Sequence, residues 1–205
     1  VATPPAVIPS VVVDSLHRYP DALVTDVGSV KGAIVDAVET VAPELAERYV
    51  PSHPMAGSQY TGPLTASAGL FVDRTWVVCR HTGNTDEAVQ QVVALAERTG
   101  ARVVTMPAAE HDVAVAQVSH VPHLMSILTA SHLRAVPGEN LALAGQGIRD
   151  VTRIAGSDPG LWKQIISANA EAIRGELDEV AEDLSYLLGV LDQPEKLEQF
   201  LGLGQ

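Results

Sequence analysis

The sequence is poor in cysteine and aromatic residues, and it has no concentration of basic residues. Its one cysteine, Cys79, cannot form an intrachain disulfide and excludes a zinc site built from several cysteines. The 13 lysines and arginines are scattered among 25 acidic residues, and a formal net charge of −12 argues against a nucleic-acid partner. We find no run of about 18 apolar residues that would span a membrane, and the N-terminal stretch lacks the charged region of a secretory signal. We therefore expect a cytoplasmic protein that binds neither nucleic acid nor membrane.

A glycine-rich phosphate-binding loop is also missing. No expected strand is followed by G-x-G-x-x-G, and the closest match, Gly145-Gln-Gly147, lacks the third glycine and lies among expected helices. A dinucleotide fold would need its first βαβ unit upstream, roughly 60 residues or more. We expect the first domain to be incomplete and this chain to hold a pyrophosphate poorly. No separate regulatory domain is expected after the helical tail.

The sequence does contain an alternation of strands and helices in residues 1–106. Short β-branched runs typical of buried strands lie at 23–27, 75–80 and 102–106. Helical patterns lie at about 8–18, 29–42 and 84–100, with Asn84 or Thr85 as a cap and Gly100 at the end. Alternation of this kind predicts a Rossmann-like α/β domain with a mainly parallel sheet.

Residues 107–205 show no convincing strand, and two long helices are expected at 108–133 and 160–191. The second carries an apolar seam that recurs every three or four residues over more than three heptads. The seam consists of Ile166, Ala170, Ile173, Leu177, Val180, Leu184, Leu187 and Leu191. It could pack within its own helical domain or pair with a second subunit. An all-helical domain of this size favours a homodimer.

Two loops after expected strands are candidates for chemistry. In TDVGSVK (25–31), Ser29 follows Gly28 at the carboxyl end of a strand, where open α/β sheets bind ligands. Ser29 could be a helix N-cap alone or a site residue. In SHPMAG (52–57), Pro54 favours an extended backbone at His53. His53 could be structural, but a fixed neutral imidazole with a pKa near 6.5 can accept a proton at neutral pH.

Two further motifs lie in the helical region. In QVSHVPHLM (117–125), His120 and His123 share a helix face, and we favour a ligand-lining role over a metal site. In GIRDVTRIAGSDPGLW (147–162), Arg149 and Arg153 either form a surface pair around Asp150 or grip a carboxylate. Ser157-Asp158-Pro159 is typical of a helix N-terminus.

Taken in order, these motifs resemble the prephenate dehydrogenase family, which includes arogenate dehydrogenases. The matching segments cover essentially the whole chain: DVGSVK at 26–31, HPMAG at 53–57, VSHVPH at 118–123 and RDVTRIAGSDPGLW at 149–162. The resemblance implies NAD(P)-dependent oxidative decarboxylation of prephenate to 4-hydroxyphenylpyruvate in tyrosine biosynthesis. Arogenate as substrate, or a non-catalytic ligand-binding dimerisation module, are the alternatives.

The resemblance also implies residue roles. His53 matches the catalytic histidine, Ser29 matches the serine that orients it, and Arg153 matches the arginine that binds the side-chain carboxylate. The other expected substrate-binding residues are Ser119, His120, His123, Trp162, Arg149 and Gln59, with Arg149 and Asp150 as candidates to reach the other subunit's site. The expected NAD or NADP contacts are Pro4, Asp26, Gly28 and Ser29. Gln59 stands where many relatives carry an acidic residue, which makes a charged gate there doubtful.

Overall fold

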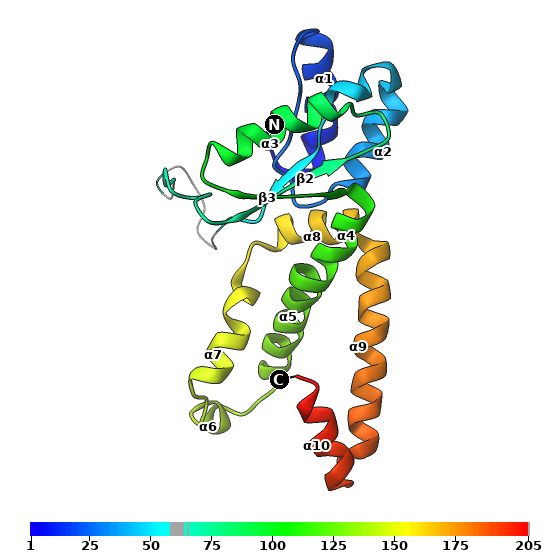
Figure 1. The fold of residues 1–205 in the computed structure, drawn as a ribbon. Coiled ribbons are helices and arrows are strands. Elements are labelled where there is room, and N and C mark those ends of the chain that lie inside the picture. Colours follow the sequence, from blue (N-terminus) through cyan, green and yellow to red (C-terminus); the bar gives the residue numbers. More distant parts are fainter. Residues whose placement is uncertain (58–63, 65, 205) are drawn as a thin grey trace.

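The first half of the chain forms a small mixed sheet with helices on both faces (Figure 1). The computed structural model describes residues 1–57, 64 and 66–204. The strands are β1 (Ser52–Pro54), β2 (Thr75–Arg80) and β3 (Arg102–Pro107), in the order β1-β2-β3. Strand β2 pairs in parallel with β3, whereas β1 pairs antiparallel with β2. The sheet of the described residues is therefore mixed: the parallel β2–β3 pairing is the longer one, and the short strand that carries His53 runs antiparallel to its neighbour.

Strand β2 is the centre of the core, as its apolar run predicts. Successive side chains point to opposite faces. Val77 and Cys79 pack with α1 (Ile8–Arg18) and α2 (Gly32–Val41), whereas Trp76 and Val78 pack with α3 (Asp86–Glu97). Strand β3 was expected to be buried as well, but it is largely exposed and Val104 keeps 42% of its surface.

The expected strand at 23–27 is reduced to one bridge between Val24 and Tyr49. The backbone N–H of Val24 donates to the Arg48 carbonyl, and the Val24 carbonyl accepts the N–H of Val50. The N–H of Val27 donates to the Val1 carbonyl. The backbone N–H of Gly28 then donates to Asp26 Oδ2 at 2.8 Å, which turns the chain and ends the pairing. Before and after these residues lie two 3₁₀ turns, η1 (Pro5–Val7) and η2 (Pro43–Arg48).

Helix boundaries in this half follow local signals only in part. Thr85 caps α3 by accepting a bond from Ala88 N–H, and Gly100 adopts φ +83° after the helix ends, as expected. Helix α2 begins at Gly32 rather than Ser29, so Ser29 is not its N-cap. The N–H groups of Lys31 and Gly32 instead bond to the Asp112 carboxylate.

The second half is helical throughout its described residues and extends away from the sheet (Figure 1). One continuous segment comprises α4 (Ala108–Val115), a π-helical turn η4 (Ala116–His120) and α5 (Val121–Leu133). Pro122 has no N–H to donate, and Val121 N–H reaches five residues back to Ala116 O. The remaining elements are α6 (Gly138–Leu141), α7 (Gln146–Thr152), η5 (Arg153–Gly156), α8 (Pro159–Ala168), α9 (Ala170–Val190) and α10 (Pro194–Gly202).

The segment Ala108–Leu133 is long and apolar enough to cross a membrane by length and composition, which the sequence pattern did not indicate. Core helices of soluble proteins share this property. Here His111, Asp112, His120 and His123 are buried within the segment, and the first three hydrogen-bond to other parts of the chain. These contacts tie the segment to the α/β half and to Asn169.

The expected helix at 160–191 is broken between α8 and α9. Asn169 leaves helical geometry at φ −121° and ψ 29°, and its side-chain amide donates to the backbone carbonyl of Asp112 at 2.8 Å. The apolar seam is divided accordingly. Ile173 is buried against Ala116 and Val121, whereas Leu184 and Leu191 remain 54% and 52% exposed.

Candidate functional site

The α/β and helical halves enclose a cavity of about 530 Å³. Seven of the residues expected to act in catalysis or substrate binding line it. They are Ser29, His53, Ser119, His120, His123, Arg153 and Trp162. They come from four separate segments, so the fold brings together motifs that lie far apart in the sequence.

His53 is held by strand β1 and by a second histidine. Its backbone pairs opposite Val77, and its Nδ1 lies 2.9 Å from His111 Nε2 with the rings edge to face. Burial, with smaller contributions from His111 and Lys31, lowers the pKa of His53 to about 3. The imidazole is therefore neutral over a wider pH range than the ordinary value near 6.5 predicts.

Ser29 lies on the loop between the Val24 bridge and α2. Side chains pack closely around this loop, because a Cβ on Gly28 would lie 2.7 Å from Ile8 Cδ1 and 2.9 Å from Asp26 Oδ2. Ser29 lines the His53 cavity and also a second, mostly apolar cavity of about 460 Å³ beside η1 and α8. The loop thus borders both spaces.

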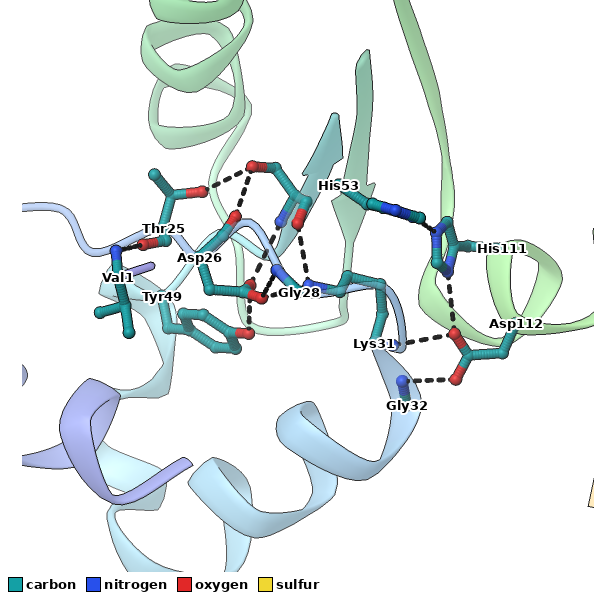
Figure 2. Close-up of polar contacts among 11 residues, drawn as sticks. Val1, Thr25, Asp26, Gly28, Lys31, Gly32, Tyr49, His53, His111 and Asp112 are labelled. Atoms are coloured by element: carbon teal, nitrogen blue, oxygen red, sulfur yellow. Dashed lines mark hydrogen bonds and ion pairs between the residues drawn. The ribbon is translucent and has the colours of Figure 1, made fainter. Parts of the chain in front are cut away.

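Asp26 was expected to contact a cofactor, but it has no exposed surface. Its carboxylate pairs with the equally buried Lys31 ammonium and accepts the Tyr49 hydroxyl at 2.8 Å. Lys31 Nζ also donates to the Ser52 carbonyl at 2.8 Å (Figure 2). Burial and the Asp26 charge raise the pKa of Tyr49. Asp26 is therefore a structural residue that ties the Ser29 loop to the strand carrying His53.

The helical half supplies an aromatic wall. Trp162, near the start of α8, stacks on His123 with ring centroids 3.4 Å apart and meets His120 edge-on at 6.0 Å. Asn169 Nδ2 lies 3.1 Å from His120 Nδ1. Burial lowers the pKa of His120 to about 4. Burial also lowers the pKa of His123 below its ordinary value. Both histidines are thus neutral, flat surfaces at physiological pH.

Arg153 brings a guanidinium to this cavity from η5, after α7. Across the described ranges neither Arg149 nor Arg153 forms an ion pair, and Asp150 accepts a bond from Gln146 instead. The surface pairing around Asp150 is therefore not formed. Arg149 is exposed on α7 and does not line the cavity. A contact between Arg149 and a substrate in the cavity of its own chain is therefore not supported.

The residues expected to contact NAD or NADP do not all lie in one place. Gly28 and Ser29 line the second cavity, whose walls are mostly apolar. Pro4 is exposed beside η1, where Pro5 and Ala6 line that cavity, and its contact stays a prediction. Gln59 falls outside the described residues. The described residues contain no glycine-rich pyrophosphate loop, and the cofactor contacts of Gly28 and Ser29 stay predictions.

Sequence reasoning missed His111 and Asp112, which lie directly behind His53. His111 has no exposed surface, and Asp112 keeps 8% of its own. Their sequence signal was the polar run of Glu110, His111 and Asp112 inside a mostly apolar helical segment, since buried polar groups need partners.

Comparison with known proteins matches both halves to one family. Residues 1–105 match the family described as prephenate dehydrogenase, nucleotide-binding domain, and residues 107–202 match prephenate dehydrogenase, dimerization domain. A Bacillus subtilis protein named prephenate dehydrogenase is 33% identical over 83% of this chain and 47% of its own length. The chain spans about half the length of the curated relatives it matches.

Solved structures give the same result. Prephenate dehydrogenase from A. aeolicus, in complex with hydroxyphenyl propionate and NAD+, superposes with a TM-score of 0.89 at 26% identity. The match covers 98% of this chain and 71% of that one. Arogenate dehydrogenase from Synechocystis gives a TM-score of 0.84 at 27% identity, covering 98% and 74%.

Proposed function

Because the chain belongs to the prephenate dehydrogenase family, we propose that the protein catalyses NAD(P)-dependent oxidative decarboxylation of prephenate to 4-hydroxyphenylpyruvate, a step of tyrosine biosynthesis. The observation that carries the proposal is the single cavity shared by His53 and Arg153. In this cavity a substrate could contact both the neutral imidazole of His53 and the cationic side chain of Arg153.

His53 receives the proton of the ring hydroxyl as the ring carbon that bears this hydroxyl gains carbonyl character. Its low pKa keeps the imidazole unprotonated before this step. The carbon that bears the hydroxyl loses hydride, and the ring carboxylate leaves as CO2 while its bonding electrons enter the ring. His53 then returns the proton to the oxygen, which becomes the phenol. No net proton is gained or lost.

Arg153 binds the carboxylate of the pyruvyl side chain. A guanidinium can donate two parallel hydrogen bonds to a carboxylate, and this fixes the end of the substrate remote from the hydroxyl. Ser29 orients the hydroxyl next to His53, and the stacked pair of His123 and Trp162 gives the ring a flat wall that excludes water. Ser119 and His120 complete the lining.

A nicotinamide cofactor, NAD or NADP, supplies the hydride acceptor when bound. Gly28 and Ser29 would hold its ring end, since Ser29 borders both cavities. The close packing around Gly28 fixes that loop. Asp26 acts on the same loop from the interior and not as a contact.

Arogenate is a second candidate substrate, because one similar structure is an arogenate dehydrogenase. The two substrates differ only in a keto or amino group on the side chain. Initial rates followed at 340 nm on the natural full-length protein, with both substrates crossed with both nicotinamides, identify the pair used. Absence of turnover in all four combinations would reject the enzyme and leave a binding module.

The decisive variant is His53→Asn. We expect kcat to fall roughly 10²- to 10⁴-fold, the range for one acid–base group, with little change in KM. Replacement of the exposed His132 by asparagine is the matched control and should leave turnover unchanged. Near-normal turnover in His53→Asn would remove His53 from the chemistry.

The proposed partner is a second copy of the chain, bound through the helical half. The family description of residues 107–202 as a dimerization domain supports this, as do the exposed side chains of Leu184 on α9 and Leu191 directly after it. Light scattering at micromolar concentration tests the dimer. A cytoplasmic location stays a prediction.

A further inference from the structure

We propose that His111 and Asp112 are positioning residues that fix the tautomer of His53, so that its Nε2 is the nitrogen that receives the substrate proton. This inference rests on the proposed function for its catalytic meaning. The geometry that carries it is independent of any substrate.

The side chains of His53, His111 and Asp112 form a row joined by hydrogen bonds (Figure 2). His53 Nδ1 lies 2.9 Å from His111 Nε2, and His111 Nδ1 lies 2.8 Å from Asp112 Oδ1. His53 lines the cavity, whereas His111 is completely buried. The row therefore joins the proposed base to a carboxylate on the interior side.

The Asp112 carboxylate accepts backbone hydrogen bonds at both of its oxygens. Its Oδ1 also accepts the backbone N–H of Lys31, and its Oδ2 accepts that of Gly32, each at 2.8 Å. These N–H groups open helix α2, where the helix dipole favours negative charge. Glycine is needed at position 32, because a Cβ there would lie 2.9 Å from Asp112 Oδ2. The side-chain amide of Asn169 donates a hydrogen bond of 2.8 Å to the backbone carbonyl of Asp112.

An ionised carboxylate only accepts hydrogen bonds, so the proton pattern of the row is determined. His111 must donate from Nδ1 to Asp112, and in the neutral ring its Nε2 is then an acceptor. His53 must in turn donate from Nδ1 to His111 Nε2, which leaves its own Nε2 without a proton. The hydrogen bond at one ring nitrogen thereby sets the state of the other.

The same row places a carboxylate behind the protonated His53 that forms during the reaction. A positive charge on His53 is shared through its Nδ1–H bond with a ring that already faces an anion. The other ionisable groups near His53 are Lys31 and His120, which come from the loop before α2 and from η4. Neither of them offers a negative charge, so Asp112 is the anion that faces this path.

Asp112→Asn and His111→Gln separate positioning from simple packing. In Asp112→Asn, an amide whose NH2 takes the place of Oδ1 donates to His111 Nδ1, which reverses the row and leaves the proton of His53 on Nε2, while the Lys31 N–H loses its acceptor. In His111→Gln the amide oxygen can still accept from His53 Nδ1 while Asp112 continues to cap α2. His111→Met removes the acceptor at similar volume and also spares the Asp112 cap.

Nitrogen-15 spectra of histidine-labelled full-length protein measure the tautomer directly, with His53 assigned from the His53→Asn spectrum. We expect Nδ1–H in the wild type and in His111→Gln, and loss of that form in Asp112→Asn and His111→Met. An Nε2–H tautomer of His53 in the wild type overturns the proposal, whether or not the protein turns over prephenate.

Kinetics provide the second readout. We expect kcat to fall about 10²- to 10⁴-fold in Asp112→Asn, the upper end being the effect of a wrong histidine tautomer in a protease triad, while KM stays the same. His111→Gln should retain more kcat than His111→Met. Equal kcat in these two variants, in an otherwise active enzyme, would refute the positioning role. An inactive wild type with the Nδ1–H tautomer would instead reject the proposed function alone.

Discussion

Because His53 is neutral at physiological pH, the protein should lose stability in acid. The substitution His53→Asn separates this loss from the effect of other titrating groups. Its folded-state pKa is about 3, whereas an unfolded histidine titrates near its ordinary value of 6.5. Between these values the unfolded chain binds the proton and the folded protein does not. Stability from this group is therefore complete above pH 6.5 and is lost as pH falls toward 3.

The magnitude follows from the two pKa values. At pH 5 the group lies about 1.5 pH units below its unfolded pKa and well above its folded one, so the loss relative to pH 8 is about 2 kcal/mol. His53→Asn removes the titrating ring. The difference in unfolding free energy between pH 8 and pH 5 should then be about 2 kcal/mol smaller in the variant than in the wild type.

Urea unfolding at both pH values measures this double difference. For a slope of about 2 kcal/mol per molar urea, the wild-type midpoint should move about 1 M further than that of the variant. Groups common to both proteins cancel. His132→Asn, which removes an exposed imidazole near the end of α5, is the control and should retain the wild-type difference. A double difference near zero in His53→Asn would show that His53 is not a buried neutral base.

Three other outcomes follow from the site. Arg153→Ala should mainly raise KM, since a charge-assisted contact to the substrate carboxylate contributes about 2–3 kcal/mol, and an unchanged KM would exclude Arg153 from that contact. Between pH 9 and pH 5, kcat/KM should not fall through protonation of His53, because the pKa of His53 lies near 3. A fall in kcat/KM with a pKa of about 6.5 that disappears in His53→Asn would contradict the burial of His53. Gly28→Ala should cost about 1–3 kcal/mol through overpacking against Ile8 and Asp26, whereas Gly69→Ala, with nothing within 4 Å of its Cβ, should unfold at the wild-type urea concentration.

The sequence by itself determined the elements with strong local signals. Strand β2, helix α1 and the Thr85 cap of α3 lie where periodicity and capping residues place them. The motif residues of the cavity were also identifiable, because HPMAG and TRIAGSDP occur in an order that is specific to one family. Local pattern thus sufficed for the individual parts and for the family.

Tertiary structure alone decided how those parts meet. The antiparallel pairing of β1, the break at Asn169 and the start of α2 at Gly32 depend on partners distant in the sequence, the last two on Asp112. His53 and His111 are 58 residues apart, and no periodicity connects them. Periodicity reports which face of an element is apolar, whereas burial of a polar group depends on a partner that the folded chain brings to it.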